Sequence, residues 1–187
     1  MNKHGAMSEA AFTASERARL LRLMAFDIDG TLTDGSILIG AQGELYKRFS
    51  VHDGLGLVWL REAGIEPVFI TGRSSEIVMR RASELGVAVV MQGVADKAAA
   101  LRQLCQERDL SLSACGFMGD DYPDLPALKI AGFAATVPHA PALLQNTAHW
   151  QASRPAGHGA ARELAEFILQ ARGDLERITA RFDGRQS

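Results

Sequence analysis

The chain has 187 residues, of which 47% are hydrophobic and 22% charged, and its formal net charge is −2. This length and apolar content predict one compact domain, and the charge does not favour nucleic acid or anionic lipid as a partner. No apolar run approaches the roughly 20 residues that cross a bilayer, so no membrane partner is expected. The two cysteines, Cys105 and Cys115, indicate neither a disulfide framework nor a metal cluster, and a cytoplasmic setting is predicted.

Residues 1–16 lack the apolar segment of a signal peptide and are predicted to form a flexible tail. A single domain is predicted over residues 17–173, followed by a charged C-terminal tail over residues 174–187. Strands are predicted at residues 24–26, 67–70, 87–91, 114–118 and 132–135, and helices at 54–63, 74–85, 95–108, 124–130 and 160–171, with Ser74 and Asp124 as candidate caps. This alternation predicts an α/β fold, a doubly wound, Rossmann-like parallel sheet flanked by helices.

The first predicted strand ends in two aspartates one residue apart, Asp27 and Asp29. Alternate side chains of a strand share a face, so one carboxylate could attack phosphorus while the other handles the proton. The competing interpretation is a solvated, Asp-rich turn. Residues 36–49 follow, with two apolar runs around a glycine-rich turn at 40–43, and they predict a small β-hairpin flap beside this site or an ordinary surface hairpin.

Polar residues also follow the second and third predicted strands. Thr71, Gly72 and Arg73 could hold phosphate oxygens with a hydroxyl, backbone N–H groups and a helix N-terminus, or could serve only as a cap turn. Lys97 lies near the start of a helix, where the helix dipole disfavours a cation unless an anion is close. It is therefore a candidate to neutralise that anion, with a solvated helix lysine as the alternative.

The fourth predicted strand runs into Gly119-Asp120-Asp121, with Asp124 shortly after. So many carboxylates do not ionise together comfortably without a cation. Magnesium prefers oxygen ligands and commonly bridges carboxylates to a phosphate, which favours Mg²⁺ held between Asp27 and Asp120. Asp124 either caps the next helix or supports the metal site.

In chain order, these segments resemble the four signature motifs of the haloacid dehalogenase superfamily: Asp27-Ile28-Asp29-Gly30-Thr31, Thr71-Gly72-Arg73, Lys97, and Gly119-Asp120-Asp121 with Asp124. Within it, residues 23–173 resemble the 3-deoxy-D-manno-octulosonate 8-phosphate phosphatase family. The resemblance rests on Asp27–Gly35, Val51–Gly56, Ile70–Ser75, Gln92-Gly93 before Lys97, and Arg154–Glu163. It implies Mg²⁺-dependent hydrolysis of that sugar phosphate in lipopolysaccharide biosynthesis.

The resemblance also implies roles for individual residues. Asp27 would form an aspartyl-phosphate, Asp29 would act as acid and then base, and Thr71 and Lys97 would stabilise the phosphoryl group. Magnesium would be held by Asp27, the backbone carbonyl of Asp29, and Asp120. The implied substrate-binding residues are Asp29, Ser50, Val51, His52, Asp53, Gly54, Gly72, Arg73, Arg81, Lys97 and Asp121.

Too little chain lies between Asp27 and Thr71, or between Lys97 and Asp120, to form a cap domain. The site of one subunit should therefore be open and walled by neighbours, in agreement with the homotetramers of the resembled family. His52 and Val58 stand where relatives often carry arginine, which leaves the exact sugar acid open. His158 also replaces a frequent arginine, which leaves open how the C-terminal segment meets a neighbouring site.

Three other interpretations remain. A phosphatase of a related nonulosonate 9-phosphate would use the same catalytic residues with altered sugar contacts. A receiver-like signalling module also pairs an aspartate with magnesium, but it keeps its acidic pair and its phosphate acceptor on different strands, whereas Asp29 supplies built-in hydrolysis. A catalytically silent subunit is disfavoured because the catalytic and metal-binding residues are all present: Asp27, Asp29, Thr71, Lys97 and Asp120.

Overall fold

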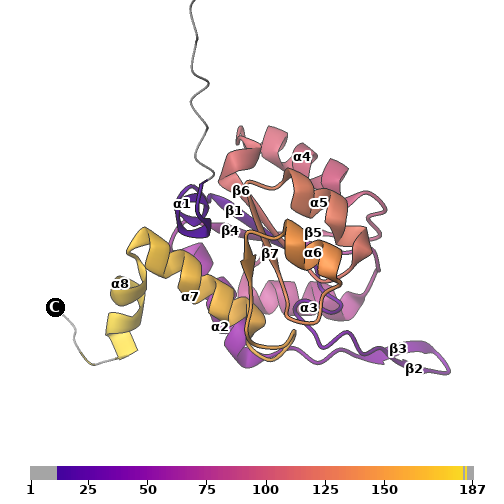
Figure 1. Cartoon of the computed structure of the whole chain (residues 1–187). Coiled ribbons are helices and arrows are strands. Elements are labelled where there is room, and N and C mark those ends of the chain that lie inside the picture. Colours follow the sequence, from indigo (N-terminus) through magenta and orange to yellow (C-terminus); the bar gives the residue numbers. More distant parts are fainter. Residues whose placement is uncertain (1–11, 183, 185–187) are drawn as a thin grey trace, which may run out of the picture.

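A computed structural model describes residues 12–182 and 184, and Figure 1 shows one domain from which a hairpin projects. The helices are α1 Ala14–Arg19, α2 Val51–Glu62, α3 Glu76–Leu85, α4 Lys97–Glu107, α5 Leu125–Ile130, α6 Ala142–Thr147, α7 Ala160–Arg172 and α8 Leu175–Thr179, with short 3-10 turns η1 Leu112–Ala114, η2 Tyr122–Asp124 and η3 Ala180–Phe182. The strands are β1 Leu23–Phe26, β2 Leu38–Gly40, β3 Gly43–Tyr46, β4 Glu66–Ile70, β5 Val89–Met91, β6 Cys115–Gly119, β7 Phe133–Thr136 and β8 Trp150–Gln151.

Six strands form one parallel sheet in the order β5-β4-β1-β6-β7-β8. Strands β1, β6 and β7 are buried at every position, as expected where helices cover both faces of a sheet. Helix α2 packs against α3 and α7, and α4 packs against α5 across the sheet from them (Figure 1). The predicted α/β doubly wound fold is confirmed.

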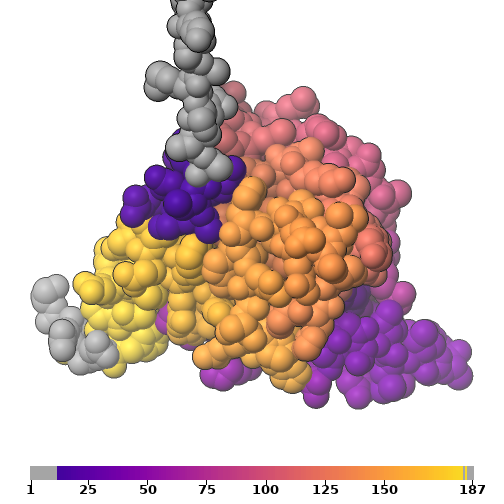
Figure 2. Space-filling model, viewed as in Figure 1, coloured from indigo at the N-terminus to yellow at the C-terminus, as the bar shows by residue number. Residues whose placement is uncertain are grey.

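The hairpin predicted after the first strand is also confirmed. Strands β2 and β3 pair antiparallel as a separate two-stranded sheet that extends beyond the domain surface (Figure 2). Between β1 and α2 the described chain forms only this hairpin, so the predicted absence of a cap domain in this segment agrees with the structure. The helices of the described residues include none that is both long and apolar enough to span a bilayer.

Several local features differ from the prediction. Strand β8 was not predicted, because two residues give no periodic signal. Strand β5 begins at Val89 rather than residue 87, since the Val87 N–H donates to the Ala82 carbonyl at the end of α3. The residue that precedes α3 is Ser75, not Ser74, and its side chain makes no capping bond.

Parts of both predicted tails are helical next to the domain. Thr13 and Glu16 form a capping box that starts α1, and Ala18 of that helix is buried. In α8, Ile178 is buried. The outer residues of both tails lie outside the described part of the chain, and the division into one domain and two tails remains a prediction.

Candidate active site

The candidate site lies where the central strands end. Asp27 follows β1, Thr71 follows β4, Asp120 follows β6, and Lys97 is the first residue of α4 after β5. The carboxyl ends of parallel strands form the usual binding edge of such a sheet. Asp27, Thr71 and Lys97 are all buried, with exposed fractions of 5%, 2% and 6%. The fold therefore holds these polar groups in a protected place, where electrostatic interactions are strong.

Lys97 bridges two carboxylates at the centre of the site. Its Nζ lies 2.5 Å from Asp27 Oδ1 and 2.5 Å from Asp124 Oδ1. Burial alone would lower the pKa of Lys97, but Asp27 and Asp124 outweigh burial and hold that pKa above its usual value. The side chain is therefore a fixed positive charge rather than a solvated helix lysine.

Asp27, Asp120 and Asp124 each present an oxygen to a common space, all within 4.8 Å of one another. Burial, together with the charge of Asp124, raises the pKa of both Asp27 and Asp120. Lys97 lowers both pKa values, but less than burial and Asp124 raise them. A hard divalent cation with carboxylate ligands fits this donor set.

The loop after β6 is fixed by Asp124. Its Oδ2 accepts hydrogen bonds from the N–H groups of Asp120 (2.9 Å) and Asp121 (3.3 Å), within the capping box of η2. Its side chain makes no capping bond to α5, so of the two roles considered for Asp124, supporting the carboxylate cluster agrees with the structure. Thr31 Oγ1 donates to Asp120 Oδ1 (2.9 Å) and orients that carboxylate from the β1 side.

Asp29 lies apart from the Lys97 bridge. Its Oδ1 accepts a hydrogen bond from Lys47, and Arg73 Nε is 3.8 Å from its Oδ2. Thr71 Oγ1 accepts from the Arg73 N–H (3.3 Å) and thereby orders the turn that carries this arginine. Gly72 is exposed on the same turn, and this turn places Arg73 near Asp29.

The predicted substrate-binding residues at the start of α2 divide into two groups. Val51 and His52 are exposed, and Ser50 caps the helix by accepting from the N–H of His52 (3.2 Å) and of Asp53 (3.4 Å). Asp53 points into the protein, where its carboxylate accepts from the N–H groups of Gly159 (3.1 Å) and Arg162 (2.9 Å). Its carboxylate is thus occupied by the start of α7.

Arg81 is likewise engaged within the protein. Its guanidinium donates to the Ser50 carbonyl (3.3 Å) and lies against Gly54, where a Cβ atom would be only 2.3 Å from Nη2. Gly54 thus leaves the space that the Arg81 guanidinium occupies. Asp121 is exposed, and its Oδ1 accepts from the Tyr122 N–H (2.8 Å).

Two charged residues of the hairpin segment, Glu44 and Lys47, reach the site and were not found from the sequence. Lys47 Nζ is 2.8 Å from Glu44 Oε1 as well as bonded to Asp29. The available signal was a Glu and a Lys three residues apart in a hairpin segment that also carries Arg48. Nothing in the local pattern, however, shows that they face Asp29.

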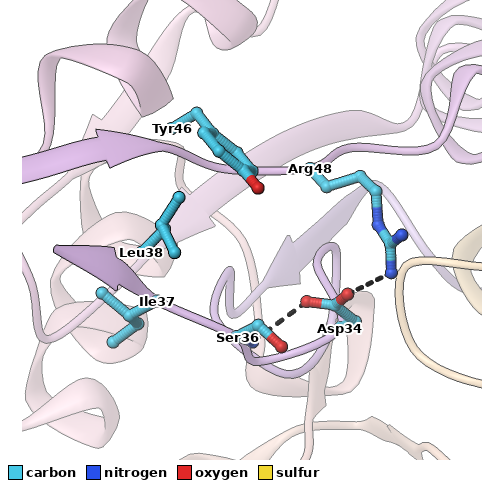
Figure 3. A pocket seen from close by; sticks show the side chains of 6 residues that line it. All are labelled: Asp34, Ser36, Ile37, Leu38, Tyr46 and Arg48. Carbon is cyan, nitrogen blue, oxygen red and sulfur yellow. Dashed lines mark hydrogen bonds and ion pairs between the residues drawn. The ribbon is translucent and has the colours of Figure 1, made fainter.

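Two pockets share Asp34 in their lining. One, of about 300 Å³, lies between the hairpin strands and is lined by Asp34, Ser36, Ile37, Leu38, Tyr46 and Arg48, with an Arg48–Asp34 ion pair at its edge (Figure 3). The other, of about 270 Å³, reaches Asp120 and is lined also by His139 and His158. His158 Nε2 lies 3.5 Å from Arg48 Nη2, so the two pockets meet at this pair of residues.

Comparisons with known proteins agree with this geometry. Residues 79–164 match the family model of the haloacid dehalogenase-like hydrolases. The chain is 36% identical over 153 residues to the 3-deoxy-D-manno-octulosonate 8-phosphate phosphatase KdsC of Haemophilus influenzae, covering 82% of this chain and 85% of that protein. It is also 36% identical over 164 residues to KdsC of Yersinia pestis, covering 88% of each chain.

Solved structures give the same result. The crystal structure of 3-deoxy-D-manno-octulosonate 8-phosphate phosphatase from Moraxella catarrhalis, in complex with magnesium, phosphate and KDO, superimposes with a TM-score of 0.88 at 40% identity, covering 90% of this chain and 97% of that one. The cobalt-bound enzyme from Haemophilus influenzae gives 0.83 at 34% identity, covering 85% and 93%. The chain therefore belongs to the haloacid dehalogenase-like hydrolases and, among them, to the 3-deoxy-D-manno-octulosonate 8-phosphate phosphatase family.

Proposed function

We propose that this protein is a Mg²⁺-dependent phosphomonoesterase that hydrolyses 3-deoxy-D-manno-octulosonate 8-phosphate to the free sugar acid and phosphate, a step of lipopolysaccharide biosynthesis. The observation that carries this proposal is the cluster of Asp27, Lys97, Asp120 and Asp124, all buried except the half-buried Asp120. It occurs in a chain whose relatives are named 3-deoxy-D-manno-octulosonate 8-phosphate phosphatases. The two free, buried cysteines agree with a reducing, cytoplasmic setting.

In the proposed reaction, Asp27 attacks phosphorus and the P–O bond to the sugar breaks as an aspartyl-phosphate forms. Asp29 gives its proton to the departing sugar oxygen and then takes one from the water that hydrolyses the intermediate. Lys97 holds Asp27 in place and compensates charge on the phosphoryl oxygens, and the Thr71 turn presents Arg73 beside them.

Magnesium would be held by Asp27, Asp120 and the backbone carbonyl of Asp29, with Asp124 behind them. The donor set fits, because these are hard oxygen ligands in a cluster where three carboxyl groups share one lysine, Lys97. When bound, Mg²⁺ offsets charge that would otherwise repel a phosphate dianion from Asp27.

We further infer that the protein works as a homotetramer in which neighbouring subunits wall each site. The projecting hairpin supports this, because Leu38, Ile39, Leu45 and Tyr46 are 44%, 69%, 58% and 58% exposed. A two-stranded hairpin is marginally stable alone, and an exposed apolar patch of this kind is typical of an interface. A phosphorylated sugar acid would then bind between the hairpin of one subunit and the strand ends of another.

The test is phosphate release, with Mg²⁺, from 3-deoxy-D-manno-octulosonate 8-phosphate, nonulosonate 9-phosphates and simple sugar phosphates. Asp27→Asn is the blank, and Asp109→Asn, an exposed aspartate away from the site, is its matched control. Preference for the octulosonate, lost only in Asp27→Asn, supports the proposal. Preference for a nonulosonate 9-phosphate would keep the mechanism, but the sugar contacts near His52 would then serve that substrate. No turnover by the wild type would contradict the proposal.

A further inference from the structure

Lys47 is a buried lysine that no step of the proposed reaction uses. It follows strand β3 of the hairpin, and its side chain is only 1% exposed. Burying an ammonium group is costly unless anions surround it, and here Nζ contacts both Asp29 Oδ1 and Glu44 Oε1. The hairpin thus places a fixed positive charge against Asp29, the second of the two aspartates that follow β1.

Glu44 is itself held by residues of the loop that precedes α3. Its Oε2 accepts a hydrogen bond from Ser75 Oγ (2.5 Å), and Arg73 Nη2 lies 3.8 Å from its Oε1. Lys47 therefore sits between two carboxylates, one of which is anchored outside the hairpin. Such a network leaves the ammonium group little freedom to leave Asp29.

The two oxygens of Asp29 are in different situations. Oδ1 is engaged by Lys47, whereas Oδ2 is buried and has no hydrogen-bond partner among the described residues. The closest charged group to Oδ2 is Arg73 Nε, at 3.8 Å, beyond hydrogen-bond distance. An unpartnered buried carboxylate oxygen is costly, and at a reaction site it is the oxygen free to exchange a proton with a ligand.

We propose that Lys47 is a positioning residue, which fixes Asp29 through Oδ1 so that Oδ2 faces the oxygen of the departing alcohol. This inference rests on the proposed function, in which Asp29 protonates that oxygen. Asp29 would move without Lys47, and proton transfer would lose its geometry while attack by Asp27 would remain. Lys47, at the base of the hairpin, would thereby complete the acid–base half of the site of its own subunit.

The test compares kcat/KM for two phosphate monoesters. A sugar phosphate leaves as an alkoxide and needs a proton, whereas p-nitrophenyl phosphate leaves as a stable phenolate and does not. We expect Lys47→Met to lower kcat/KM about 10- to 100-fold on the preferred sugar phosphate and less than about 3-fold on p-nitrophenyl phosphate. Lys47→Arg should recover part of the loss, and inhibition by inorganic phosphate should be unchanged.

Lys129→Met is the matched control, because it makes the same substitution at an exposed lysine on the last turn of α5, outside the site and the hairpin. Glu44→Gln removes one of the two carboxylates that hold Lys47, and it should lower kcat/KM with the same substrate dependence but by a smaller factor. This variant replaces Lys47→Met in the test if Lys47→Met does not fold. Equal losses on both esters, or no loss on either, would overturn the inference. If Asp29→Asn lowers kcat/KM equally for both esters, or if the wild type hydrolyses neither ester, the proposed function itself fails.

Discussion

Asp53 links the start of α2 to the start of α7, and its replacement tests how much this link contributes to stability. It is 2% exposed, and its two carboxylate oxygens accept one hydrogen bond each from Gly159 and Arg162 at the start of α7, where the N-cap residue is a glycine with no side-chain cap of its own. A hydrogen bond to a charged group contributes about 1.5–3 kcal/mol. Burial opposes this gain and raises the pKa of Asp53, so we expect Asp53→Ala to lower the free energy of unfolding by about 2–4 kcal/mol in total.

Urea unfolding followed by circular dichroism measures this change. Asp96→Ala is the control, because Asp96 caps α4 through one exposed bond to the Ala99 N–H (2.9 Å) and should cost about 1 kcal/mol. An Asp53→Ala variant no less stable than Asp96→Ala, but with a raised KM, would refute the reasoning and favour the substrate role predicted from the sequence.

The pH dependence of the same difference gives a second check. The folded pKa of Asp53 lies above its unfolded value, so the native state binds more protons between the two values and the contribution of Asp53 falls as pH rises through that window. The stability difference between the wild type and Asp53→Ala should therefore be larger near about pH 4 than near about pH 7.

Three other outcomes are expected. Gly30→Ala should raise the Mg²⁺ concentration needed for activity at least about 10-fold, because φ is +96° and a Cβ would lie 2.1 Å from Asp120 Oδ2; Gly43→Ala, with φ +112° and open space, controls for backbone strain. Mg²⁺ at about 100 times its Kd should stabilise the wild type by about 2.7 kcal/mol in thermal unfolding, an effect that Asp120→Asn should lose and that chelation should reverse. Ile39→Lys should reduce the assembly mass seen by light scattering, whereas Leu143→Lys, a 48% exposed position on α6, should not.

The sequence predicts the centre of the site because the residues concerned lie next to strong local signals. Asp27, Thr71 and Asp120 directly follow buried strands, and Lys97 begins a helix with a marked polar start. The carboxyl ends of neighbouring parallel strands meet, so order along the chain becomes proximity in space without knowledge of any single contact. The short β8 and the helices in the tails lack such periodic signals and were not predicted.

The direction of a side chain depends on partners that local sequence does not reveal. Asp53 lies in a stretch that resembles a substrate loop, yet the groups that bind its carboxylate lie more than 100 residues further along the chain. Lys47 shows the reverse case, a hairpin lysine that turns inward because Asp29 and Glu44 surround it. In both cases tertiary contacts determine the role of a charged residue.

The charged side chains of the site include more carboxylates than lysines, which bears on Mg²⁺ binding. Among the described residues, five carboxylates gather there with only two buried lysines, Lys47 and Lys97, between them; the acids are Asp27, Asp29, Glu44, Asp120 and Asp124. Arg73, half exposed at the edge, reduces the excess of negative charge but does not remove it. A phosphate dianion would be repelled from this cluster, and a divalent cation among the carboxylates cancels most of the remaining charge. Magnesium binding and phosphate binding should therefore be coupled, which is why removal of the cation is expected to abolish turnover while the buried lysines keep the apo fold intact.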